Sequence, residues 1–275
     1  MKLEDFLSDQ NKTETIEITH PFKKVKVRSD YVYVDLEDEG IMVSIEDYFR
    51  YEIRNKKGLD DDTYKQLKDH EIILKAYRSC LRKLSAKDYT IRQIKDHLYK
   101  QGLHKEIVEQ LVDKLIQYGL LDDEKYCINK IGYYDNSLLS YKQISQKLKN
   151  EGISEALLDK YLKYDHQREY DKAVKQAQKQ ASSTKNKSVK ALKQAILAKL
   201  VSNGFSYEIG NDALAEIEFS SDNEDELLQK EFDKTLKKYS KRYEGYELRQ
   251  RIFGSLLSKG FGSDDIRKVL EVENG

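Results

Sequence analysis

The sequence predicts a mainly α-helical protein in which tandem three-helix repeats form a curved, elongated array, preceded by a small β-rich N-terminal module. The repeats are indicated by a recurring spacing, in which an Ile is followed after four residues by a Leu, after four more by a Gly, and then at once by a large apolar residue. The spacing ends at Gly102, Gly152, Gly204 and Gly260, so the glycines are 50, 52 and 56 residues apart. A regular period of this length is typical of helical repeat arrays. A single proline in 275 residues also permits long helices.

Residues 1–70 are predicted to form the β-rich module, as a hairpin or three-stranded sheet with one or two helices. Three segments alternate apolar and polar residues, which is the period of a half-buried strand, and they are 14–20, 22–28 and 31–36. After Gly40 the pattern becomes helical, and Ser44 is the expected N-cap. A further helix is expected to start near Asp61.

Each repeat is predicted to end its middle helix at the glycine. A glycine directly after a helix end can adopt the left-handed conformation that closes a Schellman cap, which usually brings two apolar residues into contact. In the second repeat this makes Gly152 the cap and pairs Leu148 with Ile153. The same role is predicted for Gly102, Gly204 and Gly260, and Gly119 is predicted to cap the third helix of the first repeat in the same way.

Four repeats are expected after the module. The middle helix of the first two starts with the spacing of a capping box, Thr90 with Gln93 and Ser140 with Gln143. Because three short helices do not bury their apolar faces alone, neighbouring repeats are expected to stack and share them. The expected boundaries are 71–126, 127–166, 167–218 and 219–275.

Charge is balanced overall but uneven along the chain. With 49 basic and 49 acidic residues the net charge is zero, so the whole chain is not a general cationic surface for nucleic acid. Residues 172–207 nevertheless hold eight lysines and no carboxylate, and residues 216–226 hold six acids and no base. A binding surface and a solvated helix face both explain the basic stretch.

A basic residue followed by glutamine near the start of each middle helix is the candidate partner-binding feature. A cation in the first turn opposes the helix dipole and so has no local structural reason. Contact with an anionic partner and plain surface charge are the two explanations. The four basic residues are Arg92, Lys142, Lys193 and Arg249. The candidate set also includes Lys190 and Arg251 as cations, and Tyr243 and Tyr246 as base-stacking residues.

The sequence gives no indication of catalysis. It has no phosphate-binding loop, dinucleotide fingerprint, zinc-protease motif or nucleophile elbow. Cys80 and Cys127 are isolated, and Asp122 with Asp123 suits an N-cap better than a metal site. We therefore expect no enzyme activity, cofactor or metal. The lack of a long apolar run and the acidic start of the chain predict a soluble, cytoplasmic protein.

Several motifs match a known family in order and spacing. They are GLLDDEKY at 119–126, the segment 148–153, and the segment 227–261 with KEFDK at 230–234 and SKGF at 258–261. Over about residues 75–272 the chain resembles the RecX family, regulators of the RecA recombinase, in its long Gram-positive form. The third repeat departs most, at the polar segment 182–188 and at Gly210.

The resemblance implies a non-catalytic regulator that binds the RecA filament on single-stranded DNA. It implies mostly inhibition of filament extension, ATP hydrolysis and strand exchange, in DNA repair, recombination and the SOS response. An extended helical array suits a filament groove, and zero net charge suits a protein partner better than naked DNA. The alternative is a general DNA-binding architectural protein of helical repeats, and weak direct contact with single-stranded DNA stays open. We expect a monomer that binds no membrane.

Overall fold

The computed structural model describes residues 17–184, 186–219 and 224–272. The chain divides into two compact units, Met1–Asp122 and Asp123–Gly275. The described residues form 13 α-helices and one small antiparallel sheet, which confirms the mainly α-helical fold class. A helix long and apolar enough to cross a membrane is not found in this part of the chain.

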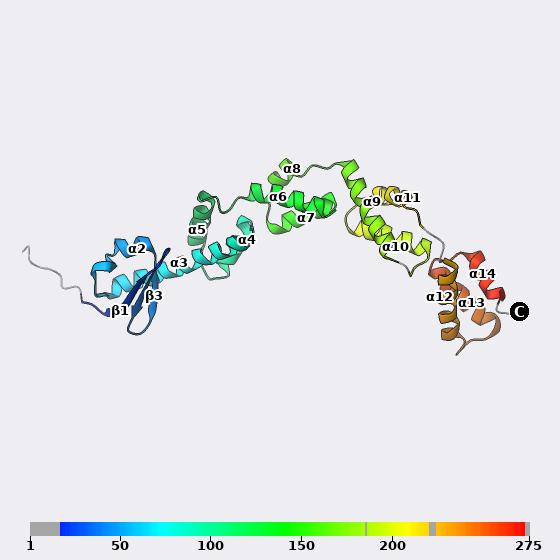
Figure 1. The fold of residues 1–275 in the computed structure, drawn as a ribbon, viewed down its shortest axis with the longest axis horizontal. Helices are drawn as coiled ribbons and strands as arrows, with labels where there is room; N and C mark the ends of the chain where they lie inside the picture. The colour runs from blue at the N-terminus through cyan, green and yellow to red at the C-terminus, as the bar shows by residue number, and fades with distance from the viewer. Residues whose placement is uncertain (1–16, 185, 220–223, 273–275) are drawn as a thin grey trace, which may run out of the picture. The chain divides into compact units, whose positions relative to one another are not determined.

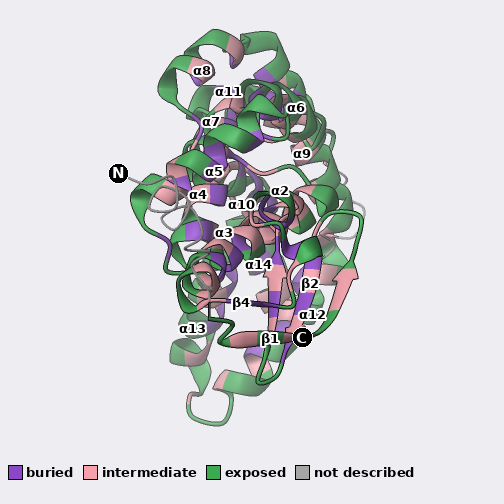
Figure 2. Cartoon of the chain, turned by 90° about the vertical axis from the view of Figure 1, so that its left-hand side faces the viewer, coloured by how far each residue is buried: buried purple, intermediate pink, exposed green. Residues whose placement is uncertain are grey.

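The sheet of the first unit has the strand order β3-β2-β1-β4. Its strands are β1 (His20–Val27), β2 (Val32–Leu36), β3 (Gly40–Val43) and β4 (Gly58–Leu59). Every second residue of β2 is buried, and these residues are purple in Figure 2. The alternation identified β1 and β2 but not the whole sheet.

One strand prediction for this module was wrong, and one strand was missed. Residues 17–19 of the expected strand 14–20 are not in a strand, and residues 14–16 lie outside the described part. The strand Gly40–Val43, just before the expected N-cap Ser44, was not predicted; it pairs with β2 and places Ile41 opposite Val34. With four residues, β3 is too short for its alternation to stand out from the helix that follows it.

The first helices of this unit begin at the expected positions. In α2 (Ile45–Arg50) the Ser44 hydroxyl accepts a hydrogen bond from the Asp47 N–H at 2.9 Å. A short 3-10 turn, Ile53–Asn55, follows, and α3 (Asp61–Ala86) then begins after an N-cap at Asp60.

Helix α3 links the module to the first repeat. It runs for 26 residues without a glycine or proline that would break it. It contributes Leu67 to the core of the module, and Ala76 and Cys80 to the core of the first repeat. Figure 1 shows it leading from the strands to α4 (Ile91–Tyr99) and α5 (Lys105–Gln117). The boundary expected between residues 70 and 71 therefore falls inside a helix.

In the second unit, the residues that the structure describes form three groups of three helices. They are α6 (Asp123–Asn136), α7 (Tyr141–Glu151) and α8 (Glu155–Tyr161); α9 (His166–Ser183), α10 (Val189–Ser202) and α11 (Tyr207–Ala215); α12 (Glu224–Tyr239), α13 (Gly245–Ser258) and α14 (Ser263–Val272). Each group has an apolar cluster of its own, drawn from its own three helices and from loop residues next to them. Apolar faces shared between neighbouring repeats were expected, and for the clusters of this unit that prediction was wrong.

The five predicted capping glycines all adopt a left-handed conformation. Their φ angles are +81° at Gly102, +67° at Gly119, +98° at Gly152, +88° at Gly204 and +86° at Gly260. The residue after Gly152, Ile153, donates its N–H to the Leu148 carbonyl at 3.0 Å, which is the long hydrogen bond of a Schellman cap. Both capping boxes are also present, at Thr90 and at Ser140.

Replacing Gly152 with alanine is expected to lower the free energy of unfolding by about 1 kcal/mol or more, because a β-carbon is disfavoured at positive φ. Gly262 is the matched control, since it lies outside the left-handed region and an added Cβ would meet the flexible end of Asp265. The midpoint of chemical denaturation is the measurement. Equal midpoints for the two variants would show that the cap carries no special constraint.

Candidate partner-binding surface

The six predicted cations are exposed, but the four at the recurring position are not equivalent. Arg92 and Lys142 are the second residues of α4 and α7 and lie two residues before a buried Ile. Lys193 and Arg249 are instead the fifth residues of α10 and α13 and lie three residues before a buried Ile. Because each residue turns an α-helix by about 100°, these two side chains point in a different direction from the first two.

A second difference is that α10 and α13 begin earlier, relative to the capping glycine, than α4 and α7 do. Their N-caps are Ser188 and Glu244, each 16 residues before the capping glycine, whereas Ser140 is 12 residues before Gly152. Lys193 and Arg249 therefore lie in the second turn, where the argument from the helix dipole does not apply. The four cations were expected near the start of each middle helix, and for Lys193 and Arg249 that placement was wrong.

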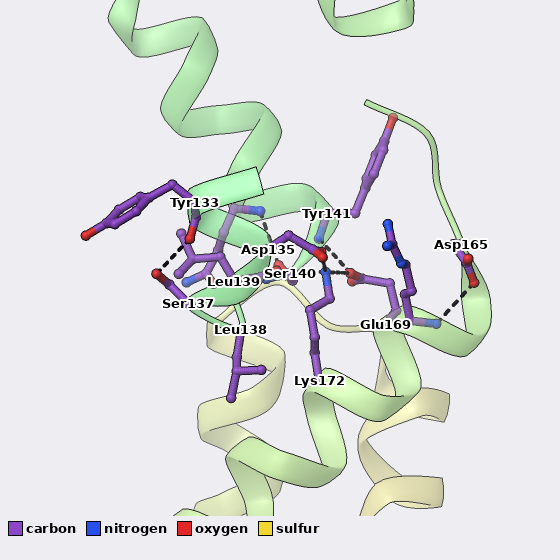
Figure 3. Close-up of polar contacts among 12 residues, drawn as sticks. Tyr133, Asp135, Ser137, Leu138, Leu139, Ser140, Tyr141, Asp165, Glu169 and Lys172 are labelled. Carbon is purple, nitrogen blue, oxygen red and sulfur yellow. Dashed lines mark hydrogen bonds and ion pairs between the residues drawn. The ribbon is translucent and has the colours of Figure 1, made fainter. Parts of the chain in front are cut away.

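Lys172, the first lysine of the basic stretch at residues 172–207, is not available to bind a partner. Lys172 is only 7% exposed, and its ammonium lies 2.5 Å from Glu169 and 3.1 Å from Asp135. It also donates a hydrogen bond to the Leu139 carbonyl at 2.9 Å. Figure 3 shows Lys172 reaching from α9 to the end of α6, beside Glu169. This lysine neutralises the buried Glu169 carboxylate and also pairs with the partly exposed Asp135.

The other lysines of this stretch that the structure describes lie on the surface. Lys175, Lys179, Lys187, Lys190 and Lys199 are exposed, as is Lys193. The Lys193 ammonium lies 4.8 Å from the centroid of the Phe219 ring, a cation–π contact that orients it.

The densest group of cations and tyrosines lies in the fourth repeat. We name residues 237–251, from the last turn of α12 to the second turn of α13, the α12–α13 corner. The corner contains two acidic residues, Glu244 and Glu247, and six exposed cations. The cations are Lys237, Lys238, Lys241, Arg242, Arg249 and Arg251. The corner also holds Tyr239, Tyr243 and Tyr246. Four of the eight candidate residues predicted from the sequence lie in this corner. The cations of the corner that were not predicted could have been found from the run of basic residues in the sequence.

The tyrosine rings of the α12–α13 corner differ in their exposure and in their contacts with other side chains. The Arg251 guanidinium lies 4.6 Å from the centroid of the Tyr243 ring, and Tyr239 meets Tyr243 edge to face at 6.2 Å. Tyr246 is 77% exposed, and its hydroxyl accepts a hydrogen bond from the Gln250 amide at 2.7 Å. Tyr246 therefore presents the more accessible ring for stacking.

Neither cysteine of the chain has the environment of a reactive thiol. Cys80 and Cys127 are buried, and burial raises the pKa of each thiol. A protonated thiol is a weak nucleophile and a poor metal ligand. Both residues instead pack in the apolar clusters of their repeats.

Two family models match this chain. RecX, first three-helix domain, matches residues 76–115, and RecX, third three-helix domain, matches residues 222–270. A regulatory protein RecX from Streptococcus mutans is 37% identical over 197 residues, covering 68% of this chain and 73% of that protein. Another from Lactococcus lactis subsp. cremoris is 31% identical over 243 residues, covering 86% and 90%. The chain belongs to the RecX family.

The likeness to other RecX proteins extends over most of the chain. A regulatory protein RecX from Streptococcus sanguinis is 28% identical and covers 90% of this chain and 97% of that protein. A crystal structure of regulatory protein RecX superposes with a TM-score of 0.54 at 24% identity, over 72% of this chain and all of that one, so the two share the fold. The α12–α13 corner lies within the match to the third RecX domain.

Proposed function

We propose that this RecX-family protein regulates the RecA recombinase by binding the RecA filament on single-stranded DNA. In this proposal it acts without catalysis, and its main effect is to inhibit filament extension, ATP hydrolysis and strand exchange during DNA repair and recombination. The observation that carries the proposal is the match, over nine tenths of both chains, to a protein named regulatory protein RecX. The setting is the cytoplasm, where RecA acts.

The charge distribution supports local contacts rather than a general attraction to nucleic acid. The net charge is zero, but exposed cations recur on the middle helices of all four repeats. Clustered cations on a neutral protein attract an anionic surface at short range and are screened by salt at longer range. A filament that carries DNA within a protein coat offers that kind of partner.

Reversing the charge of Arg92, Lys142, Lys193 and Arg249 to glutamate is expected to weaken inhibition of RecA ATP hydrolysis. The loss is expected to grow as salt is lowered, because the attraction that is removed is screened less. The measurement is DNA-dependent ATP hydrolysis by RecA against increasing amounts of each protein. Folding is expected to change little, because exposed charges contribute little to stability, and circular dichroism checks this.

A matched control for this variant reverses four other exposed lysines, Lys57, Lys100, Lys105 and Lys230. It changes the net charge by the same amount and leaves the candidate residues in place. Inhibition is expected to fall more for the candidate set than for the control. Identical curves for the two variants at low salt would move the binding surface away from the middle helices.

Direct contact with single-stranded DNA is the second candidate function, and the α12–α13 corner favours it. Its cations match a phosphate backbone and its tyrosines match unstacked bases. Replacing Tyr246 with alanine is expected to weaken binding to a single-stranded oligonucleotide about 5- to 150-fold, since stacking on one base contributes about 1–3 kcal/mol. Fluorescence anisotropy at low salt measures the affinity. Tyr207→Ala is the control, because Tyr207 is 66% exposed and lies outside the corner.

Tyr246→Phe distinguishes stacking from hydrogen bonding. It keeps the aromatic ring and removes the hydroxyl that accepts from Gln250. Binding close to the wild-type level is therefore expected. An equal affinity for Tyr246→Ala and Tyr207→Ala would remove the corner as a stacking site.

A further inference from the structure

Consecutive repeats of the second unit are joined by a polar contact that recurs. Between the second and third repeats the Ser140 hydroxyl donates a hydrogen bond to the Asn203 carbonyl at 2.6 Å. Between the third and fourth repeats the Ser188 hydroxyl donates to the Lys259 carbonyl at 2.7 Å. Both serines are buried N-caps of a middle helix, and both carbonyls belong to the residue directly before a capping glycine.

A glutamate completes the contact at each junction. The Tyr141 N–H donates to the Glu169 carboxylate at 2.9 Å, and the Val189 N–H donates to the Glu224 carboxylate at 3.1 Å. Tyr141 and Val189 are the first residues of α7 and α10, where a backbone N–H has no acceptor within its own helix. The first helix of each following repeat therefore supplies an acceptor that the preceding middle helix lacks.

The capping glycines allow the close approach of the two repeats. A Cβ added to Gly204 would lie 2.8 Å from the Ser140 hydroxyl, and one added to Gly260 would lie 2.7 Å from the Ser188 hydroxyl. A Cβ added to Gly102 would meet nothing within 4 Å, although its φ is equally positive. Gly204 and Gly260 are therefore required both by the cap and by the neighbouring repeat.

We propose that each junction is a latch, formed by an N-cap serine, a glutamate and a capping glycine, that opens without unfolding the repeat on either side. The physical reason is that opening exchanges hydrogen bonds with water at a small net cost and leaves the apolar cluster of each repeat intact. Repeats joined in this way change their relative orientation as separate bodies. A partner that binds several repeats then selects the orientation that it fits.

The two latches differ in strength. Glu169 is 4% exposed and also contacts the buried ammonium of Lys172, whereas Glu224 is only partly buried. The Gln176 amide adds a hydrogen bond to the Leu138 carbonyl at 2.7 Å between the second and third repeats. Water competes more readily for Glu224, so the latch between the third and fourth repeats is the one that opens more often.

Hydrogen exchange of single backbone amides, followed by NMR on the free full-length protein, tests the proposal. Val189 is expected to exchange faster than Tyr141, and both faster than the Leu200 amide inside α10. In Glu224→Ala the Val189 amide is expected to exchange about fivefold faster or more, because one hydrogen bond has been lost. The Tyr141 and Leu200 amides are expected to keep their rates.

Gly260→Ala and Gly102→Ala form a matched pair that tests the close approach. Both place a methyl group at positive φ, but only the first places it against the neighbouring repeat. Val189 exchange is expected to accelerate in Gly260→Ala and to stay unchanged in Gly102→Ala. If Gly260→Ala unfolds the fourth repeat, Glu224→Ala still decides the question, because it alters neither the glycine nor the apolar cluster.

A distance measurement supplies an independent readout. Spin labels at the exposed positions Lys190 and Arg267 report the separation of the third and fourth repeats by pulsed electron paramagnetic resonance. A broader distance distribution in Glu224→Ala than in the otherwise unchanged protein would support the latch. An unchanged distribution, or Val189 exchange at the rate of Leu200 in both proteins, would overturn it.

Discussion

Replacing Lys172 with methionine is expected to lower the free energy of unfolding of the second unit by about 3–5 kcal/mol, as removal of one partner of a buried ion pair does. The Lys172 ammonium lies 2.5 Å from the Glu169 carboxylate, which is 4% exposed. Methionine has a similar shape but no charge, so Glu169 would remain in the interior without its partner. Urea denaturation followed by circular dichroism measures the loss.

Two further variants separate charge from packing at this position. Lys175→Met changes an exposed lysine of the same helix and is expected to alter stability by less than about 0.5 kcal/mol. Adding Glu169→Gln to Lys172→Met is expected to restore part of the loss, because the buried negative charge is removed. A loss below about 1 kcal/mol for Lys172→Met would show that water already solvates the Glu169 carboxylate.

Replacing Phe232 with alanine is expected to cost about 3–5 kcal/mol, the usual loss when a buried aromatic ring is deleted. Phe232 is 1% exposed, and its cluster contains only residues of the fourth repeat. The loss is therefore expected to fall on that repeat alone. The measurement is thermal unfolding combined with hydrogen exchange, in which the amides of α12, α13 and α14 are expected to lose protection before those of α10.

Phe49→Ala is the control for this second variant, because Phe49 is 65% exposed. It is expected to cost less than about 1 kcal/mol. A single transition that lowers the stability of all repeats by the same amount in Phe232→Ala would mean that the repeats unfold together. The latch between the third and fourth repeats would then be too strong to open by itself.

The sequence predicted the ends of helices better than their starts. A capping glycine followed by a large apolar residue is a local signal, and all five such glycines have the expected conformation. The starts at Thr90 and Ser140 were found because a glutamine three residues later completes a capping box. Ser188 lacks that glutamine, so the earlier start of α10 was missed and Lys193 was placed in the first turn.

The structural features that the sequence did not predict depend on contacts between residues far apart in the chain. The sequence shows that Glu169 and Lys172 are three residues apart and can form an ion pair. It does not show that the pair is buried, because burial depends on Asp135 and on the loop before α7, more than 30 residues away. The strand β3 depends in the same way on its pairing with β2. The polar junctions between repeats follow from contacts that join residues 63 and 71 positions apart.

Binding to single-stranded DNA across a salt titration, with and without a preformed RecA filament, tests the proposed role of this RecX-family protein. The labelled full-length protein is mixed with the oligonucleotide alone or with the same oligonucleotide coated by RecA, and its affinity is followed by anisotropy. We expect tighter binding to the filament that persists at salt concentrations where binding to naked DNA is lost. Equal affinity for the two, falling with the same dependence on salt, would contradict a RecA regulator and indicate a general DNA-binding protein.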